Sequence, residues 1–426
     1  MMKYDVLTLS SSSASDFSAG GSESFNGDDD EDTKDDFTQL LVSDDNPCQE
    51  STCHTCIGTR THLFWAMFAM IILATTCAMS TNQQCNNRDG VQVDILPTAD
   101  QRLPPKSELP DIAWLMSFPN SGTSYTLRLV QAVSNTTAAT NYAEECMQDS
   151  SGNVATLYDS PSGPYLRQQA ASLPKAYIPT KTHCGGRCVH CIPEKYVVDA
   201  NTFHEQCLTG TLTGPPGVIN EFSIHMNAKD SLMNRTHVHY SVDSAARVRK
   251  AIHLIRDPFN NIVARFHLEY NNHKAARTNF TVQFPNNATG FRSWCDDLDQ
   301  QYHRKENKTK LISSEIKAYF DAVPCHSEFF RWAQWHNMAL EVLEKLAIPS
   351  YTLYYESYEE SSFELTLTGI LRFLELERVG KASPFIAGKA YHGYYTKAEL
   401  MASMELIKAV STPEAWSLVQ RYKPNK

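Results

Sequence analysis

The sequence has fewer basic than acidic residues. Its 426 residues hold 38 Lys and Arg against 48 Asp and Glu, a formal net charge of −10. Three of these bases but thirteen of these acids lie within residues 1–60, so the acidic excess belongs to the N-terminal segment and the rest of the chain is neutral overall. A neutral body excludes a strongly basic nucleic-acid-binding domain, and we expect no nucleic-acid partner.

Lys, Arg, Asp and Glu are all absent between Arg60 and Arg88. Residues 63–79 form an apolar run close to the ~20 residues that cross a bilayer, and Trp65 lies near one end, where aromatic rings favour the interface. We predict one transmembrane signal-anchor helix over residues 61–81 that contacts the lipid bilayer through residues 63–79. A cleaved signal peptide is the alternative, but such a peptide begins near residue 1.

The segments on either side of this span differ in composition. Residues 1–60 are rich in Ser and acids with little to bury, which predicts a disordered acidic cytosolic tail. Its string Asp36–Leu41 resembles an acidic dileucine sorting signal, with a plain solvated tail as the alternative. Residues 82–110 are polar and then proline-rich, which predicts a stem. We expect one globular domain over residues 111–426.

Cysteines and glycosylation sequons indicate the orientation of the chain in the membrane. Eight of the 12 cysteines follow the span, an even number that permits disulfides in an oxidising compartment. The dense group Cys184–Cys191 also admits zinc ligands, but disulfides suit a lumenal domain better. All five sequons follow the span as well, at Asn135, Asn234, Asn279, Asn287 and Asn307. We therefore expect a type II protein with its large domain in the lumen.

A strand, a glycine-containing loop and a helix follow one another near the start of this domain. Residues 112–118 are an apolar run of strand length, residues 119–124 read Pro-Asn-Ser-Gly-Thr-Ser, and residues 125–133 have helical periodicity. This order builds a phosphate cradle, because backbone N–H groups at the helix start point at the anion. The Walker lysine after Gly122 is missing, so a magnesium–ATP enzyme fits poorly; a tight structural turn is the other alternative.

Two further apolar runs end in residues that suit chemistry on an anion. The run 250–255 leads into Arg256-Asp-Pro and a helical stretch over 259–270, and the run 176–183 ends in Lys181-Thr-His183. Strands that alternate with helices predict an α/β fold with a parallel sheet flanked by helices and chemistry at the carboxyl ends of its strands.

Together these segments resemble the sulfotransferases that use 3′-phosphoadenosine 5′-phosphosulfate (PAPS). Residues 117–125 resemble the family's 5′-phosphosulfate loop, residues 250–267 its 3′-phosphate segment, and Lys181-Thr-His183 the motif that carries its base. Residues 353–357 and 365–376 resemble its late strand and helix. The resemblance implies a P-loop-type, sulfotransferase-like fold, PAPS as co-substrate and no metal.

The resemblance also implies a role for particular residues. His183 would take the proton of an acceptor hydroxyl, and Lys181 would stabilise charge on the transferring group. The residues implied to bind PAPS are Asn120, Ser121, Gly122, Thr123, Ser124, Tyr125, Arg256, Arg265 and Tyr355.

Two positions depart from the family pattern. Asn120 stands where the family usually has Lys, and Ala264 where it has a Ser that contacts the 3′-phosphate, for which Arg265 or His267 can substitute. A catalytically impaired binding or scaffold protein is therefore the alternative to an enzyme. The Arg-Lys-Gly string of cytosolic members is missing near the C-terminus, which favours a Golgi membrane protein. A neutral domain favours a neutral or lightly charged glycan as acceptor.

Overall fold

The computed structural model describes residues 108–147, 154–158, 160–168, 172–186, 191–213, 235–384 and 391–424. All of these lie in one compact unit, Leu96–Lys426. The predicted tail, membrane span and most of the stem lie outside the described residues. Within the described part of the chain, none of the helices combines the length and the apolar character that a bilayer crossing needs.

A six-stranded sheet in the order β3-β2-β4-β1-β7-β8 forms the centre of the domain. All its pairings are parallel except that of β2 with β3. A second, two-stranded antiparallel sheet joins β5 and β6. The predicted α/β class with a mostly parallel sheet is confirmed. The strands are β1 Asp111–Ser117, β2 Ala139–Thr140, β3 Tyr165–Leu166, β4 Tyr177–Thr182, β5 Thr209–Thr213, β6 Arg235–His239, β7 Val248–Ile255 and β8 Ser350–Tyr354.

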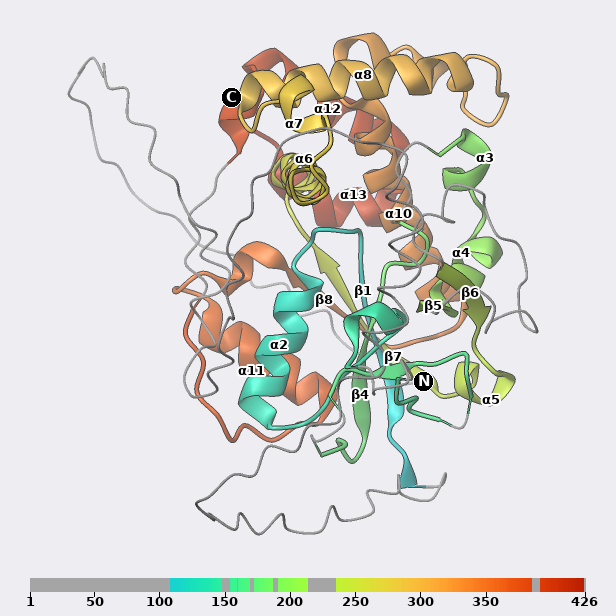
Figure 1. Ribbon diagram of the computed structural model, residues 1–426, viewed down its shortest axis with the longest axis vertical. Coiled ribbons are helices and arrows are strands. Elements are labelled where there is room, and N and C mark those ends of the chain that lie inside the picture. Colours follow the sequence, from blue (N-terminus) through green and yellow to red (C-terminus); the bar gives the residue numbers. More distant parts are fainter. Residues whose placement is uncertain are drawn as a thin grey trace, which may run out of the picture. The chain divides into compact units, whose positions relative to one another are not determined.

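Helices cover both faces of the central sheet (Figure 1). On one face lie α2 Thr123–Ser134 and α11 Phe363–Leu374. The other face carries α4 Ala200–Cys207, α6 Pro258–Ala275, α8 Ala288–Glu306, α10 His326–Lys345, α12 Lys397–Val410 and α13 Pro413–Val419. The shorter helical segments are α3 Pro193–Tyr196, α5 Val242–Ala245, α7 Phe280–Gln283, α9 Ser314–Lys317, η3 Ala143–Glu145, η5 Phe320–Ala322, η6 Tyr355–Tyr358, η7 His392–Tyr394 and η8 Gln420–Tyr422.

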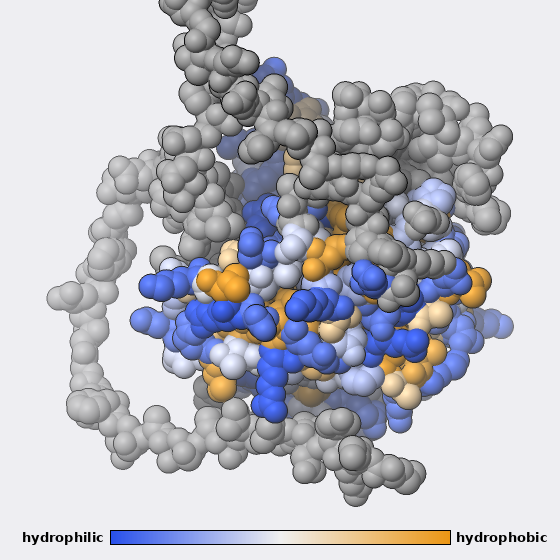
Figure 2. Space-filling view, turned by 90° about the horizontal axis from the view of Figure 1, so that it is seen from below, coloured by the Kyte–Doolittle hydropathy of each residue, from blue (hydrophilic) through white to orange (hydrophobic). Residues whose placement is uncertain are grey.

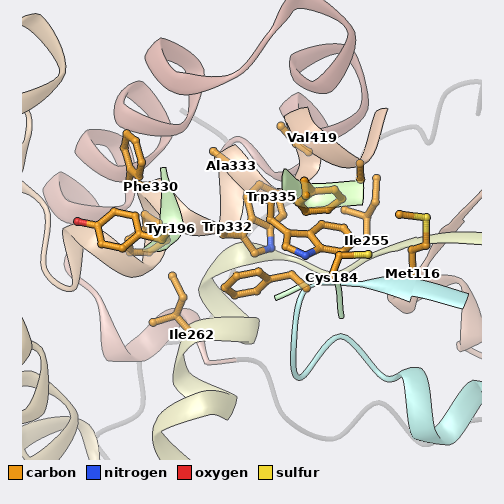
Figure 3. Close-up of a cluster of buried hydrophobic side chains, with 14 of the residues drawn as sticks. Met116, Cys184, Tyr196, Ile255, Ile262, Phe330, Trp332, Ala333, Trp335 and Val419 are labelled. Atoms are coloured by element: carbon orange, nitrogen blue, oxygen red, sulfur yellow. The ribbon is translucent and has the colours of Figure 1, made fainter. Parts of the chain in front are cut away.

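The alternation of side chains along β1 divides the hydrophobic core into two layers. Ala113 and Leu115 point into the layer with α2 and α11, whereas Trp114 and its neighbours on the same side join the larger layer. This is the period-2 pattern of a strand that is buried on both faces. Figure 3 shows Trp332 and Trp335 of α10 beside the ends of β1 and β7 in the larger layer.

The start of α6 explains the Arg-Asp-Pro motif. The Asp257 side chain accepts hydrogen bonds from the N–H groups of Phe259 and Asn260, at 2.8 and 3.1 Å, which satisfies donors that the first helical turn leaves open. Pro258 occupies the first helical position, where its missing N–H costs nothing. The motif therefore begins a helix directly after β7 and holds Arg256 at the junction.

Strand β1 lies at the point where the direction of sheet growth reverses. The chain adds β2 and β4 on one side of β1 and later adds β7 and β8 on the other side. In open α/β sheets, ligands bind outside the carboxyl ends of the strands at such a switch point. The loop after β1, Lys181 and His183 at the end of β4, and Arg256 after β7 all lie at this edge.

The opposite end of the sheet has a mixed surface. Figure 2 views the domain from the end at which β1 begins, and hydrophobic residues there are interspersed with hydrophilic ones. Lys181, His183 and Arg256 lie instead at the carboxyl end of the strands.

Candidate active site

The loop between β1 and α2 turns sharply at two positions. Asn120 has a φ of 64° and Gly122 a φ of 93°, in the left-handed region that glycine adopts freely and Asn more readily than most residues. A Cβ atom on Gly122 would lie 2.4 Å from the Tyr355 ring. The ring therefore covers the loop at a position where only glycine fits.

The N-terminus of α2 opens onto the carboxyl edge of the sheet. Gly122 occupies the N-cap position and no side chain caps the helix. The first intrahelical bond joins the Thr126 N–H to the Gly122 carbonyl at 2.9 Å, so the preceding N–H groups remain outside the helix's own ladder. Open N–H groups and the helix dipole together favour an anion at this end.

The three hydroxyl residues predicted in this loop have different surroundings. Ser121 is buried and its Oγ accepts a hydrogen bond from Asn261 Nδ2 at 3.0 Å. The buried Thr123 hydroxyl bonds to the Ser117 hydroxyl at 2.5 Å. The side chains of Ser121 and Thr123 therefore shape the loop from inside, while Ser124 meets Lys181.

Lys181 brings a positive charge to the helix end from the neighbouring strand. Its Nζ donates to Ser124 Oγ at 2.9 Å and to Glu145 Oε1 at 2.7 Å, and its side chain is 6% exposed. Residues two apart in a strand share a face, so Lys181 and His183 face the loop while Thr182 turns away toward the Cys207 carbonyl. The spacing of the Lys-Thr-His motif follows from this geometry.

Glu145 belongs to the candidate site although no sequence motif identifies it. It belongs to η3, which follows β2, and it lies between Lys181 and Arg167, whose Nη1 is 3.8 Å from Glu145 Oε2. The adjacent Glu144 instead accepts from the Thr211 hydroxyl at 3.2 Å. No periodic pattern marks residues 141–147, so only the fold distinguishes the two acids.

His183 is buried and its tautomer can be read from its partners. Nδ1 lies 2.9 Å from the Ser117 carbonyl oxygen. A carbonyl oxygen only accepts hydrogen bonds, so Nδ1 carries a proton, and in the neutral form of the ring Nε2 would keep its lone pair. The His183 backbone N–H donates to the Tyr142 hydroxyl at 2.8 Å, and the two rings stack. The arrangement suits a general base.

Arg256 approaches the loop from the other side of β1. Its Nη1 donates to the Asn120 carbonyl at 2.6 Å, and its guanidinium lies 4.5 Å from the centre of the Tyr355 ring. Its Nε is buried without a hydrogen-bond partner among the described residues. A guanidinium with an unused donor next to an open helix end is suited to bind an anion.

Arg265 lies in the core behind the loop. Its Nε lies 2.6 Å from Glu328 Oε2, where both side chains are at most 6% exposed, and its guanidinium lies 5.1 Å from the centre of the Phe118 ring. Its Nη2 is buried without a hydrogen-bond partner among the described residues, and its assignment to PAPS binding stays a prediction. His267, the other substitute, lies against Asn286 and the Tyr394 ring.

Two predicted tyrosines line the loop. The Tyr125 ring packs edge-on against Tyr358 at 5.0 Å between ring centres. Burial, and secondarily Tyr355, raises the pKa of Tyr125 to about 12, so its hydroxyl is a neutral hydrogen-bonding group near pH 7. Tyr355 packs between Gly122 and Arg256.

Two disulfides stabilise the described domain. One joins Cys184, directly after His183, to Cys207 at the end of α4, and the other joins Cys295 of α8 to Cys325 before α10. Cys191 is also disulfide-bonded. Among the described residues, the His, Cys, Asp and Glu side chains form no group of three or more that could hold a metal ion.

Comparisons with models of protein families, with curated proteins and with solved structures gave no significant match.

Proposed function

We propose that this protein is a membrane-anchored sulfotransferase that transfers the sulfuryl group of PAPS to a hydroxyl, carried by a glycan. The observation that carries the proposal is the convergence of Lys181, His183 and Arg256 on the uncapped N-terminus of α2. Two strands that are distant in sequence, β4 for Lys181 and His183 and β7 for Arg256, supply these residues at one edge of the sheet. Their order and types are those of the PAPS-dependent family that the sequence resembles.

The residues around the loop fit a co-substrate that carries several negative charges. Open N–H groups of α2 and the Ser124 hydroxyl would hold one anionic group, and Arg256, with its unused Nε, would hold a second. Tyr355 offers an aromatic surface beside Arg256. PAPS, when bound, would supply the sulfuryl group to be transferred.

The chain's own residues would perform the remaining work. His183 would take the proton of the acceptor hydroxyl at Nε2 while its Nδ1–H stays on the Ser117 carbonyl. Lys181 would stabilise the charge that develops on the oxygens next to Ser124. The disulfides in the described domain accord with an oxidising lumen, and we propose a Golgi location with residues 63–79 in the bilayer.

A direct assay tests this proposal. The full-length protein is incubated with sulfur-labelled PAPS and pooled glycans, and label in the glycans is counted. We expect transfer that falls by about 10²–10⁴-fold in His183→Ala, the range for loss of a general base. The matched control His303→Ala, on the exposed face of α8, should keep full activity. Equal activity in both variants would remove His183 from the mechanism.

A binding protein without catalysis is the second candidate, and one observation favours it. Glu145 already engages Lys181 at 2.7 Å, and Asn120 carries no charge where the family has Lys. Adenosine 3′,5′-bisphosphate, the product that remains after transfer, serves as the probe. Binding of this compound without any labelled transfer would favour the binding protein, and absence of both would exclude both candidates.

A further inference from the structure

Three basic side chains gather along the flank of α2 that faces β2 and β3. Lys181 lies beside Ser124 at the start of the helix. Arg128 is one helical turn further along, on the same face as Ser124, and is exposed. Arg167 comes from the residue after β3. The sequence gives no hint of this group, because its members lie on three separate elements.

An acidic side chain lies among these cations. Glu145 contacts both Lys181, at 2.7 Å, and Arg167, at 3.8 Å. The neighbouring Glu144 accepts from Thr211 of β5. The Glu145 carboxylate therefore bridges Lys181 and Arg167.

The Arg167 guanidinium has a buried donor that makes no hydrogen bond within the described part of the chain. Its side chain is 13% exposed, and within the described residues its Nη1 is buried without a hydrogen-bond partner. Burial lowers the pKa of Arg167, Glu145 partly offsets this, and repulsion from Arg128 lowers it further. A buried Nη1 group without a hydrogen bond, on a guanidinium that a second arginine repels, costs stability. Such local conflicts are expected where a ligand completes the site.

The order of the strands indicates which ligand would approach Arg128 and Arg167. Arg256 follows β7 on one side of β1, whereas Lys181, Arg167 and His183 belong to the β4–β2–β3 side. If Arg256 binds the far phosphate of the co-substrate, the basic group lies on the opposite side of the loop. That side carries the candidate base His183, so it is the side from which an acceptor must approach.

We propose that Arg167, with Arg128, binds an oxyanion carried by the acceptor, so that the acceptor is an acidic carbohydrate bearing a carboxylate or sulfate group. This inference rests on the proposed function, because the roles of Arg256 and His183 determine the side from which the acceptor approaches. A guanidinium presents paired donors that match either oxyanion. The overall neutrality of the domain is compatible with this local charge, because one anionic group needs only a few cations.

Binding to matched sugars tests the inference without relying on catalysis. The full-length protein, saturated with adenosine 3′,5′-bisphosphate, is titrated with methyl glucuronide, glucose 6-sulfate and the neutral methyl glucoside, and binding is followed by ligand-observed NMR. We expect at least one acidic sugar to bind about tenfold more tightly than the glucoside, as for a charged hydrogen bond, and the two acidic arms distinguish carboxylate from sulfate. The preference should weaken as salt is added.

Variants identify the residues responsible. Arg167→Gln should remove the acidic preference and leave glucoside binding unchanged, and the exposed Arg128→Gln should reduce the preference several-fold even if Arg167→Gln fails to fold. Arg304→Gln on α8 is the matched control and should change nothing. Equal binding of acidic and neutral sugars, absence of binding by all three, or an acidic preference that survives in both variants would overturn the proposal. Binding of adenosine 3′,5′-bisphosphate is measured separately, so its loss would count against the proposed function instead.

Discussion

Glu145 controls how much charge Lys181 can offer to an incoming anion. The carboxylate lies 2.7 Å from Lys181 Nζ at a site where both side chains are at most 20% exposed. Its negative charge therefore competes with any anion that binds at the start of α2. Sequence patterns point to Lys181, but the residue that restrains it becomes visible only in the fold.

Glu145→Gln should therefore strengthen the binding of adenosine 3′,5′-bisphosphate. The amide keeps the shape and a hydrogen-bond acceptor for Lys181 but removes the competing charge, so we expect a several-fold lower Kd by calorimetry. Glu144→Gln is the matched control, because Glu144 contacts Thr211, and it should leave the Kd unchanged. An unchanged or higher Kd in Glu145→Gln would mean that Glu145 supports the site rather than competing within it.

A substitution at Gly122 should weaken the binding of adenosine 3′,5′-bisphosphate. With φ at 93° and the Tyr355 ring 2.4 Å from the position of a Cβ, Gly122→Ala adds backbone strain of about 1–2 kcal/mol and pushes the ring away. Affinity for adenosine 3′,5′-bisphosphate should fall and Tm should drop. Gly393→Ala, where nothing lies within 4 Å of the new methyl group, is the control. Equal effects of the two changes would rule out a special role for the loop.

At the level of elements, the two disulfides have separate tasks. Cys184–Cys207 joins the residue after His183 to the end of α4, and Asn141 further fixes the Cys207 carbonyl at 2.8 Å. Cys295–Cys325 joins α8 to the start of α10, among helices that do not carry the candidate catalytic residues. The first disulfide therefore fixes the chain next to the candidate base His183, and the second stabilises the helical layer.

Replacing each disulfide by Ser pairs tests this division. The two bonds close loops of 23 and 30 residues, so each loss should destabilise folding by about 2–4 kcal/mol. We expect only the Cys184/Cys207 variant to lose sulfuryl transfer when assayed at low temperature, where both variants remain folded by circular dichroism. If the Cys295/Cys325 variant lost activity to the same extent, positioning of His183 would not be the reason.

Elements with strong periodicity could be predicted from sequence. Strands β1, β4 and β7 match predicted apolar runs, because a strand buried on both faces needs continuous hydrophobicity. Helices α2 and α6 follow their helical patterns to within a few residues. The short strands β2 and β3 have only two residues each, too few for any pattern, and they carry the segments that supply Glu145 and Arg167.

The ion pair of Arg265 could not be predicted for a related reason. Its position nine residues after Arg256 on α6 suggested a second phosphate ligand, but Glu328 of α10 pairs with it in the core. A partner more than sixty residues away leaves no mark on the local sequence. Long-range ion pairs of this kind, like the contact of Glu145 with Lys181, are set by the packing of elements and not by any one motif.

At the scale of the whole molecule, buried histidines give the stability a defined pH range. His326 donates to Glu306 at 2.7 Å and lies 3.0 Å from Asp299. Burial alone would lower its pKa, but hydrogen bonds and charge from Asp299 and Glu306 prevail and raise the pKa to about 9. A raised pKa adds stability that is complete below about pH 6.5 and is lost as the pH rises toward 9.

Unfolding by urea should therefore show a loss of stability between pH 6.5 and 9, on the order of 3 kcal/mol from this group. His326→Gln should lower stability at pH 6.5 and flatten the alkaline decline. His303→Gln, at an exposed position on α8, should keep the wild-type profile. A decline that persists unchanged in His326→Gln would assign it to other groups.

A pair of buried histidines sets the acid limit of stability. His253 and His336 share a 2.8 Å hydrogen bond between β7 and α10, and burial lowers the pKa of His253 to about 4 and that of His336 in the same direction. A lowered pKa means that the unfolded chain binds protons first, so stability should fall as the pH drops from about 6.5 toward 4. His326 on the alkaline side and the His253–His336 pair on the acid side thus predict maximal stability near pH 6.5. This mildly acidic value accords with the proposed Golgi lumen. His253→Gln should reduce the acid slope without changing the alkaline one, whereas a maximum well above pH 8 in the wild-type protein would contradict both assignments.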